Sequence, residues 1–170
     1  MGFFDKLFKK EEEINLPAVN VSDDAIVAVA DGQLIDVTTV SDPVFAEKMM
    51  GESTAFKFDK DKVVLCAPAN GTLTVLFPTG HAFGITRTDG VELLVHCGVN
   101  TVEAKGDGFH LLNKKQGDTV NAGDPIVEVD LRKLAANYDM STMLIITNPN
   151  GKEFHFLDPQ PVTRGQSVIH

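Results

Sequence analysis

Short apolar segments separated by turn-forming residues extend from Ala25 to the C-terminus of this chain. Runs of Val, Ile, Leu and Phe, each only a few residues long, alternate with Gly, Asn and Asp. Such a pattern is typical of brief strands that are joined by tight turns. We therefore predict an all-β fold, an antiparallel β-sandwich or flattened barrel with a few short helices.

The sequence also repeats itself weakly. At an offset of 39 residues, the segment VADGQL at 29–34 aligns with PANGTL at 68–73, and both have the composition of a turn next to a strand. Two copies are too few for a solenoid, which requires three or more. The repeat therefore indicates an internally duplicated β unit.

Three local signals predict short helical segments. Asp42 is a suitable N-terminal cap, Pro43 follows it, and Gly51 can end the segment, which predicts a helix over 43–50. A second helix is expected after Asp130, and 106–112 has room for a single turn. None of these segments is long enough to organise the fold.

Composition limits the classes of function. The 170 residues, 43% of them hydrophobic, suit one buried core, so we expect one domain over 25–170 that follows a separate segment over 1–24. A formal charge of −9 argues against a nucleic-acid partner. No apolar run approaches the roughly 20 residues of a membrane span. Cys66 and Cys97 are too few for a disulfide scaffold and are expected as buried strand residues in a cytoplasmic protein.

The N-terminal segment has a distinct pattern. Residues 1–10 place four apolar side chains on one helical face and three lysines elsewhere, and they lack the apolar stretch and cleavage site of a signal peptide. So short a helix is marginal in water, which leaves weak peripheral membrane contact and a frayed terminus as alternatives. Residues 11–24 are rich in acidic side chains and are predicted to be a solvated linker.

Two histidines stand at the ends of one predicted hairpin. A turn signal at 87–90 separates His81 from His96, so folding back at this turn brings both imidazoles to one end of the paired strands. His96 lies in a nearly continuous apolar run, where loss of water lowers the pKa of an imidazole. A carbonyl at Gly98 could accept one ring N–H and leave the other nitrogen as an oriented nucleophile. The alternative is a hydrogen-bonded core histidine.

Three chemistries compete for these residues. Zinc hydrolysis requires a third ligand that the neighbourhood of His96 does not supply. A thiol mechanism is disfavoured because Cys97 is adjacent to His96 in a strand and should point to the opposite face. Phosphoryl transfer requires a neutral nucleophile, donors for the phosphoryl oxygens and access for a partner, and His96, His81 and the hydroxyl of Thr79 can supply these roles.

Four segments together resemble the glucose-type enzyme IIA of the bacterial sugar phosphotransferase system. They are VFAEK at 44–48, GHAF at 80–83, GVELLVHCGVNTV at 90–102 and KGDGF at 105–109. The resemblance extends from about Ala25 to the C-terminus, and the first seven residues resemble the N-terminal segment of the free-standing enteric protein, which is thought to touch membranes. It implies a duplicated hybrid-motif fold of this β class.

The resemblance also implies roles for particular residues. His96 would accept phosphate on Nε2 from the small histidine phosphocarrier protein and pass it to a cysteine on the IIB domain of a sugar permease. His81 would steady the phosphoryl group, Thr79 would belong to the same network, and the carbonyl of Gly98 would orient His96. Positions that form the rim of the family's site, where partners dock, are matched here by Asp42, Val44, Phe45, Phe77 and Leu94.

The chain departs from the enteric pattern at three places. Asn100 stands where the enteric proteins carry an aspartate, which removes one negative charge from the rim and is expected to alter docking electrostatics. Gly51-Glu-Ser replaces Gly-Asp-Gly, and Cys97 stands where Phe commonly follows the active histidine. None of these changes removes a catalytic group.

Two functions follow from the resemblance. The first is phosphoryl relay through His96 for uptake and phosphorylation of glucose or a related sugar. The second is a regulatory binding module whose phosphorylation state selects partners such as transporters and controls carbon metabolism. No cofactor and no intrinsic metal is expected, although His81 and His96 could share a zinc ion with a partner's carboxylate in a complex.

Overall fold

The computed structural model describes residues 14–170. The amphipathic pattern of residues 1–10 therefore lies outside the described residues. Within them the strands are β1 (Gly32–Ile35), β2 (Glu52–Lys57), β3 (Lys62–Cys66), β4 (Gly71–Leu76), β5 (Ala82–Thr86), β6 (Glu92–Cys97), β7 (Phe109–Leu111), β8 (Thr119–Val120), β9 (Pro125–Asp130), β10 (Thr142–Asn148) and β11 (Gln160–Val162). The helices are short: η1 (Val37–Thr39), α2 (Pro43–Ala46), η2 (Thr101–Ala104) and α3 (Leu131–Leu134).

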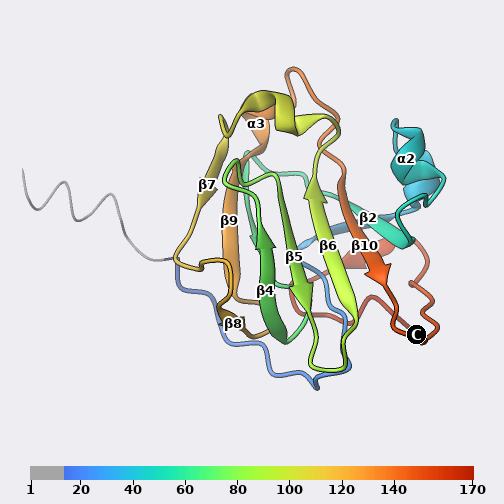
Figure 1. The fold of residues 1–170 in the computed structure, drawn as a ribbon. Coiled ribbons are helices and arrows are strands. Elements are labelled where there is room, and N and C mark those ends of the chain that lie inside the picture. Colours follow the sequence, from blue (N-terminus) through green and yellow to red (C-terminus); the bar gives the residue numbers. More distant parts are fainter. Residues whose placement is uncertain (1–13) are drawn as a thin grey trace, which may run out of the picture.

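The strands form two antiparallel sheets (Figure 1). The larger has the order β11-β1-β2-β10-β6-β5-β4-β8, and the smaller has the order β3-β9-β7. Every pairing between these strands is antiparallel. The flattened β-sandwich with few short helices that the sequence predicts is confirmed.

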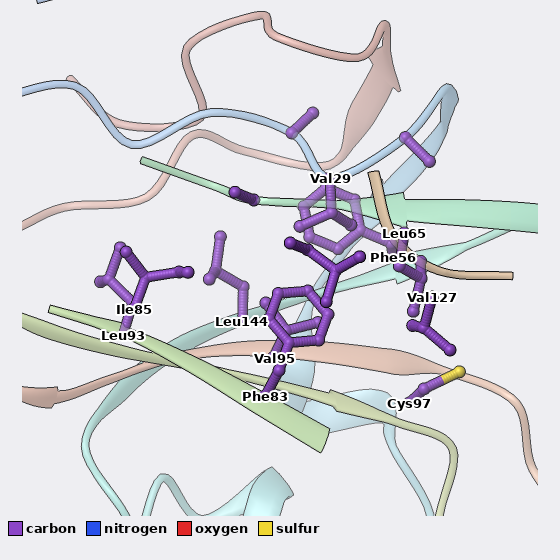
Figure 2. Packing of buried hydrophobic residues seen from close by; sticks show 14 of the residues in the cluster. Val29, Phe56, Leu65, Phe83, Ile85, Leu93, Val95, Cys97, Val127 and Leu144 are labelled. Carbon is purple, nitrogen blue, oxygen red and sulfur yellow. The ribbon is translucent and has the colours of Figure 1, made fainter. Parts of the chain in front are cut away.

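The main core fills the space between the sheets, and a second, smaller core lies on the other face of β10. Figure 2 shows Phe83 and Val95 of the larger sheet in the main core with Leu65 and Val127 of the smaller one. The second core, beside α2, is formed by Val37, Val40, Phe45, Ala55, Val99, Met143 and Ile145. β10 is therefore buried on both faces, as its continuous apolar sequence requires.

The internal repeat is visible in the backbone hydrogen bonds. Ala28 donates to and accepts from the peptides at 165–166, and Ala67, 39 residues later, makes the same pair of bonds with the peptides at 123–124. The two copies also bond to each other, because the amide of Val27 donates to the carbonyl of Pro68 at 2.8 Å. The repeated sequence thus corresponds to two β units that pack against each other.

The predicted helices are present in part. Asp42 caps α2 as expected, but the helix ends at Ala46 because Lys48 adopts a left-handed φ of 55°. Leu131–Leu134 forms α3 after Asp130. The turn predicted over 106–112 is wrong in its second half, because Phe109–Leu111 is strand β7, paired with β9.

Part of the predicted linker lies against the body. The side chain of Arg164 donates to the carbonyl of Pro17, and the side-chain Nδ2 of Asn70 donates to the carbonyl of Val21 at 3.0 Å. The side chain of Val19 packs closely over Gly123 and Gly165. Residues 17–21 are therefore held along the surface of the repeat units rather than being fully solvated.

Candidate functional site

The hairpin of β5 and β6 brings the two histidines together. Ala82 lies opposite His96 in the register, and the amide of Cys97 donates to the carbonyl of His81 at 2.7 Å. The two imidazole rings lie with centroids 5.3 Å apart and with an interplanar angle of 79°. The turn at Arg87–Gly90 therefore places both rings at one end of the hairpin, as predicted from the sequence.

Strand alternation decides which way His96 points. Leu94 and His96 lie opposite Ile145 and Met143 of β10, so their side chains share the face that carries the second core. Cys97 points the other way into the main core, where burial raises the pKa of its thiol to about 12 (Figure 2). The prediction that Cys97 faces away from His96 is confirmed.

The ring of His96 is oriented through Nδ1. This atom lies 2.8 Å from the carbonyl oxygen of Gly98, and since a carbonyl can only accept, Nδ1 carries the proton and Nε2 carries the lone pair. Gly98 has a φ of +79°, and a Cβ there would lie 2.4 Å from the methyl group of Thr101. Glycine is therefore required at the position that supplies the orienting carbonyl.

His81 is held in a similar way by a different partner. Its Nδ1 lies 2.6 Å from the hydroxyl of Thr79, which can donate or accept. The residue is only 5% exposed, and burial lowers the pKa of its imidazole. No hydrogen bond within residues 14–170 uses Nε2 of either histidine. Each ring thus has one nitrogen anchored and one left for other contacts.

The surroundings keep His96 neutral near pH 7. The pKa of His96 is lowered to about 4, because burial and the nearby His81 lower it more than the Gly98 carbonyl and the charge of Asp42 raise it. Burial is the largest of these effects. A half-buried imidazole of this kind is an uncharged nucleophile at neutral pH.

The predicted rim residues surround the two rings. The centroid of Phe45 lies 4.9 Å from that of His96, and the centroid of Phe77 lies 5.1 Å from that of His81. Phe77 and Val44 are exposed, Leu94 is half-buried, and Phe45 is buried beneath them in the second core. The structure thus gathers the predicted apolar residues at one site.

Two predicted polar positions flank this rim. The carboxylate of Asp42 is half-buried and accepts from the amide of Val44 at 2.8 Å, which caps α2. Asn100 is exposed and has a φ of 60° at the start of η2. Asparagine tolerates this left-handed conformation better than most residues.

Further exposed apolar side chains were missed by the sequence reasoning. Val75 lies beside Gly84, which in turn lies opposite Leu94, so Val75 extends the apolar rim across three strands. A bulge between Leu73 and Val75 breaks the alternation of β4, and a strict two-residue period does not reveal it. Met49, Met50 and Val102 are exposed as well, on the segments that follow α2 and Asn100.

The described residues provide no cluster of three or more His, Cys, Asp or Glu side chains that could hold a metal ion. Within residues 14–170, no helix is long and apolar enough to cross a membrane.

The fold and the site together define a β-sandwich that presents a neutral, oriented imidazole beside a second histidine within an apolar rim. Residues 24–152 match the family described as phosphoenolpyruvate-dependent sugar phosphotransferase system, EIIA 1. The chain therefore belongs to this EIIA family, as its motifs predict.

Individual relatives agree with this assignment. The chain is 36% identical over 168 residues to the glucose-specific EIIA component of Staphylococcus aureus (strain COL), covering 98% of this chain and 96% of that protein. It is 39% identical over 145 residues to the glucose-specific EIICBA component of Staphylococcus carnosus, covering 85% of this chain and 21% of that longer protein. The solved structure of glucose permease IIA from Mycoplasma capricolum matches with a TM-score of 0.79 and 37% identity, covering 85% of this chain and 93% of that one.

Proposed function

We propose that this protein is a cytoplasmic phosphoryl carrier that accepts phosphate on Nε2 of His96 from the histidine phosphocarrier protein. It then passes the group to the IIB domain of a glucose-type permease, for uptake and phosphorylation of the sugar. The observation that carries the proposal is the hydrogen bond from Nδ1 of His96 to Gly98, which leaves Nε2 with its lone pair beside a second imidazole. The glucose-specific names of relatives support the choice of sugar.

In the proposed transfer, Nε2 of His96 attacks the phosphorus of the donor's phosphohistidine. The new N–P bond forms as the donor's N–P bond breaks, and the donor imidazole leaves with its electron pair. The positive charge that develops on the His96 ring is stabilised by the Gly98 carbonyl at Nδ1. His81, with Nδ1 accepting from Thr79, can present an Nε2–H to a phosphoryl oxygen.

The apolar rim supports docking of protein partners. Val44 and Phe77 are 40% and 42% exposed beside the two rings, and a partner that covers them excludes water from the phosphoryl group. Asp42 gives this rim an acidic position, and Asn100 contributes no charge. We therefore propose that partners contact the rim with apolar and basic side chains.

The proposal is tested by incubating the protein with phosphoenolpyruvate and the upstream carriers. The expected product is a base-stable, acid-labile phosphoprotein in the wild type and in His110→Ala, because His110 is an exposed histidine on β7 away from the hairpin. His96→Ala should not be labelled. Labelling of His96→Ala to the wild-type level overturns the proposal.

A second candidate function is a regulatory binding module, favoured by the apolar rim around the histidines. Phosphorylation would place about two negative charges among apolar side chains, which disfavours any partner that buries them. Phosphorylated and unphosphorylated forms should then capture different proteins from the native lysate. Identical sets of captured proteins would contradict the regulatory function, and only the phosphoryl relay would then stand.

A further inference from the structure

The carboxylate of Asp139 lies near the site but takes no part in the proposed transfer. Asp139 lies in the loop before β10 and accepts three hydrogen bonds. One oxygen accepts from the hydroxyl of Ser41 at 2.9 Å, and the other accepts from the amide and the hydroxyl of Ser141 at 3.0 and 2.7 Å. Asp139 therefore joins two segments that lie 98 residues apart in the sequence.

The first segment leads into α2. Ser41 immediately precedes Asp42, the cap of this helix, and Phe45 of the same helix lies against the ring of His96. A four-residue helix has little stability of its own. The bond from Ser41 to Asp139 is thus a tertiary anchor at the start of the element that covers His96.

The second segment supports the orienting carbonyl. The amide of Gly98 donates to the carbonyl of Ser141 at 2.9 Å, and the amide of Val99 donates to the carbonyl of Asp139 at 2.8 Å. These bonds fix the peptide unit that contains the Gly98 carbonyl, which accepts from His96, and the peptide unit before it. The loop that carries Asp139 therefore fixes the position of the Gly98 peptide through backbone hydrogen bonds.

We infer that Asp139 is a positioning residue, which locks α2 and the Gly98 carbonyl together so that His96 keeps one orientation. This inference rests on the proposed function for its catalytic meaning, but the geometry it describes is measurable by itself. Burial acts to raise the pKa of Asp139, but the hydrogen bonds from Ser141 and Ser41 outweigh it and hold the pKa below the ordinary value. The carboxylate is thus ionised and a strong acceptor at neutral pH.

The test uses NMR of the imidazole nitrogens in the intact protein. In Asp139→Ala, exchange of the His96 Nδ1–H with water should become about tenfold faster, since a charged acceptor that anchors the loop has been lost. In Ser41→Ala, the cross-peak between the rings of Phe45 and His96 should weaken. Asp118→Ala is the matched control, because Asp118 also accepts a turn amide, that of Lys115 at 2.9 Å, and should leave both signals unchanged.

Folded variants with wild-type exchange and wild-type ring contact would overturn the inference. If Asp139→Ala does not fold, Ser41→Ala decides, because it removes one hydroxyl from an exposed residue. Phosphoryl acceptance is measured on the same samples and should fall about tenfold in Asp139→Ala. A wild type that takes no phosphate refutes the proposed function, whereas the NMR result still decides the role of Asp139.

Discussion

At the scale of single residues, the site depends on which nitrogen of His96 carries the proton. The Gly98 carbonyl assigns it to Nδ1, and burial keeps the ring neutral near pH 7. The proton position is set by a backbone carbonyl, and burial is the largest cause of the lowered pKa of His96. In the proposed transfer, the unphosphorylated site would therefore present an uncharged nucleophile wherever the pH is well above 4.

Burial of His96 also makes stability depend on pH. The pKa of His96 is lowered to about 4 in the folded state, against about 6.5 in an unfolded chain, so the unfolded chain binds more protons in this window. The contribution of His96 to stability is therefore fully present above pH 6.5 and should fall by up to about 3 kcal/mol as the pH drops from 6.5 to 4. Urea unfolding at pH 6.5 and pH 4 should show a smaller loss of unfolding free energy in His96→Gln than in the wild type. Equal losses in both proteins would contradict the lowered pKa.

Gly98 should not tolerate a side chain. In Gly98→Ala, the new Cβ would meet the methyl group of Thr101 and the sulfur of Met140, and the φ of +79° is strained for alanine. We expect a loss of about 1–3 kcal/mol of stability and a displaced carbonyl. The check is the His96 Nδ1–H signal together with urea unfolding, and an unchanged signal would show that the carbonyl is not constrained by glycine.

Several of these residue contacts were predictable, and others were not. The orientation of His96 follows from its distance of two residues from Gly98, and the direction of Cys97 follows from strand alternation, so both are local properties. The bond from Ser41 to Asp139 joins residues 98 apart, and no local pattern signals such a contact. The bulge that turns Val75 outward is equally invisible to a regular period.

At the scale of elements, the β5–β6 hairpin carries the site at one end and a charge network at the other. Arg87 is buried and donates to the carboxylate of Asp89 and to the carbonyl of Asp24, and its guanidinium lies 5.4 Å from the ring of Phe154. Lys152 pairs with Asp89 at 2.7 Å. The turn is thereby tied to the N-terminal segment and to the loop after β10.

Breaking this network should be costly. Arg87→Met should lose about 3 kcal/mol of unfolding free energy, because it removes the buried partner of Asp89 and leaves the carbonyl of Asp24 without its donor. Lys133→Met is the matched control, since its pair with Asp107 is exposed and should be worth less than about 1 kcal/mol. Urea unfolding compares them, and similar losses would refute a structural role for the Arg87 network.

Elements defined by turn chemistry were predicted better than helix lengths. The hairpin turn and the cap at Asp42 follow from local residues. The conformation of the segment over 106–112 does not follow from local residues. Gly106 and Gly108 take left-handed conformations, and the following residues pair with strand β9. Tertiary pairing decided that conformation over local propensity.

At the scale of the whole molecule, the main core and the site around His96 lie on different faces of the larger sheet. The main core lies between the sheets, whereas His96 and Leu94 lie on the other face of the larger sheet, which carries the second core and α2. The class of fold was predictable because alternation and turns repeat along the chain. The order of the strands was not, since neighbours such as β2 and β10 are distant in sequence.

This separation predicts that variants of the exposed rim residues affect docking with little effect on stability. Val44→Asp should change stability by less than about 0.5 kcal/mol, because Val44 is 40% exposed, but it should weaken transfer from the phosphocarrier protein by placing a charge on the apolar rim. The check is the rate of transfer as a function of donor concentration beside urea unfolding. A variant that transfers like the wild type would exclude Val44 from the docking surface.

The most direct test of the proposed phosphoryl transfer is to identify which atom of the protein is phosphorylated. After incubation with phosphoenolpyruvate and the upstream carriers, phosphorus–nitrogen coupling in the NMR spectrum of the labelled protein locates the bond. We predict coupling to Nε2 of His96, with Nδ1 still protonated by its bond to Gly98. Coupling to Nδ1 of His96, or to His81, would contradict the proposed transfer.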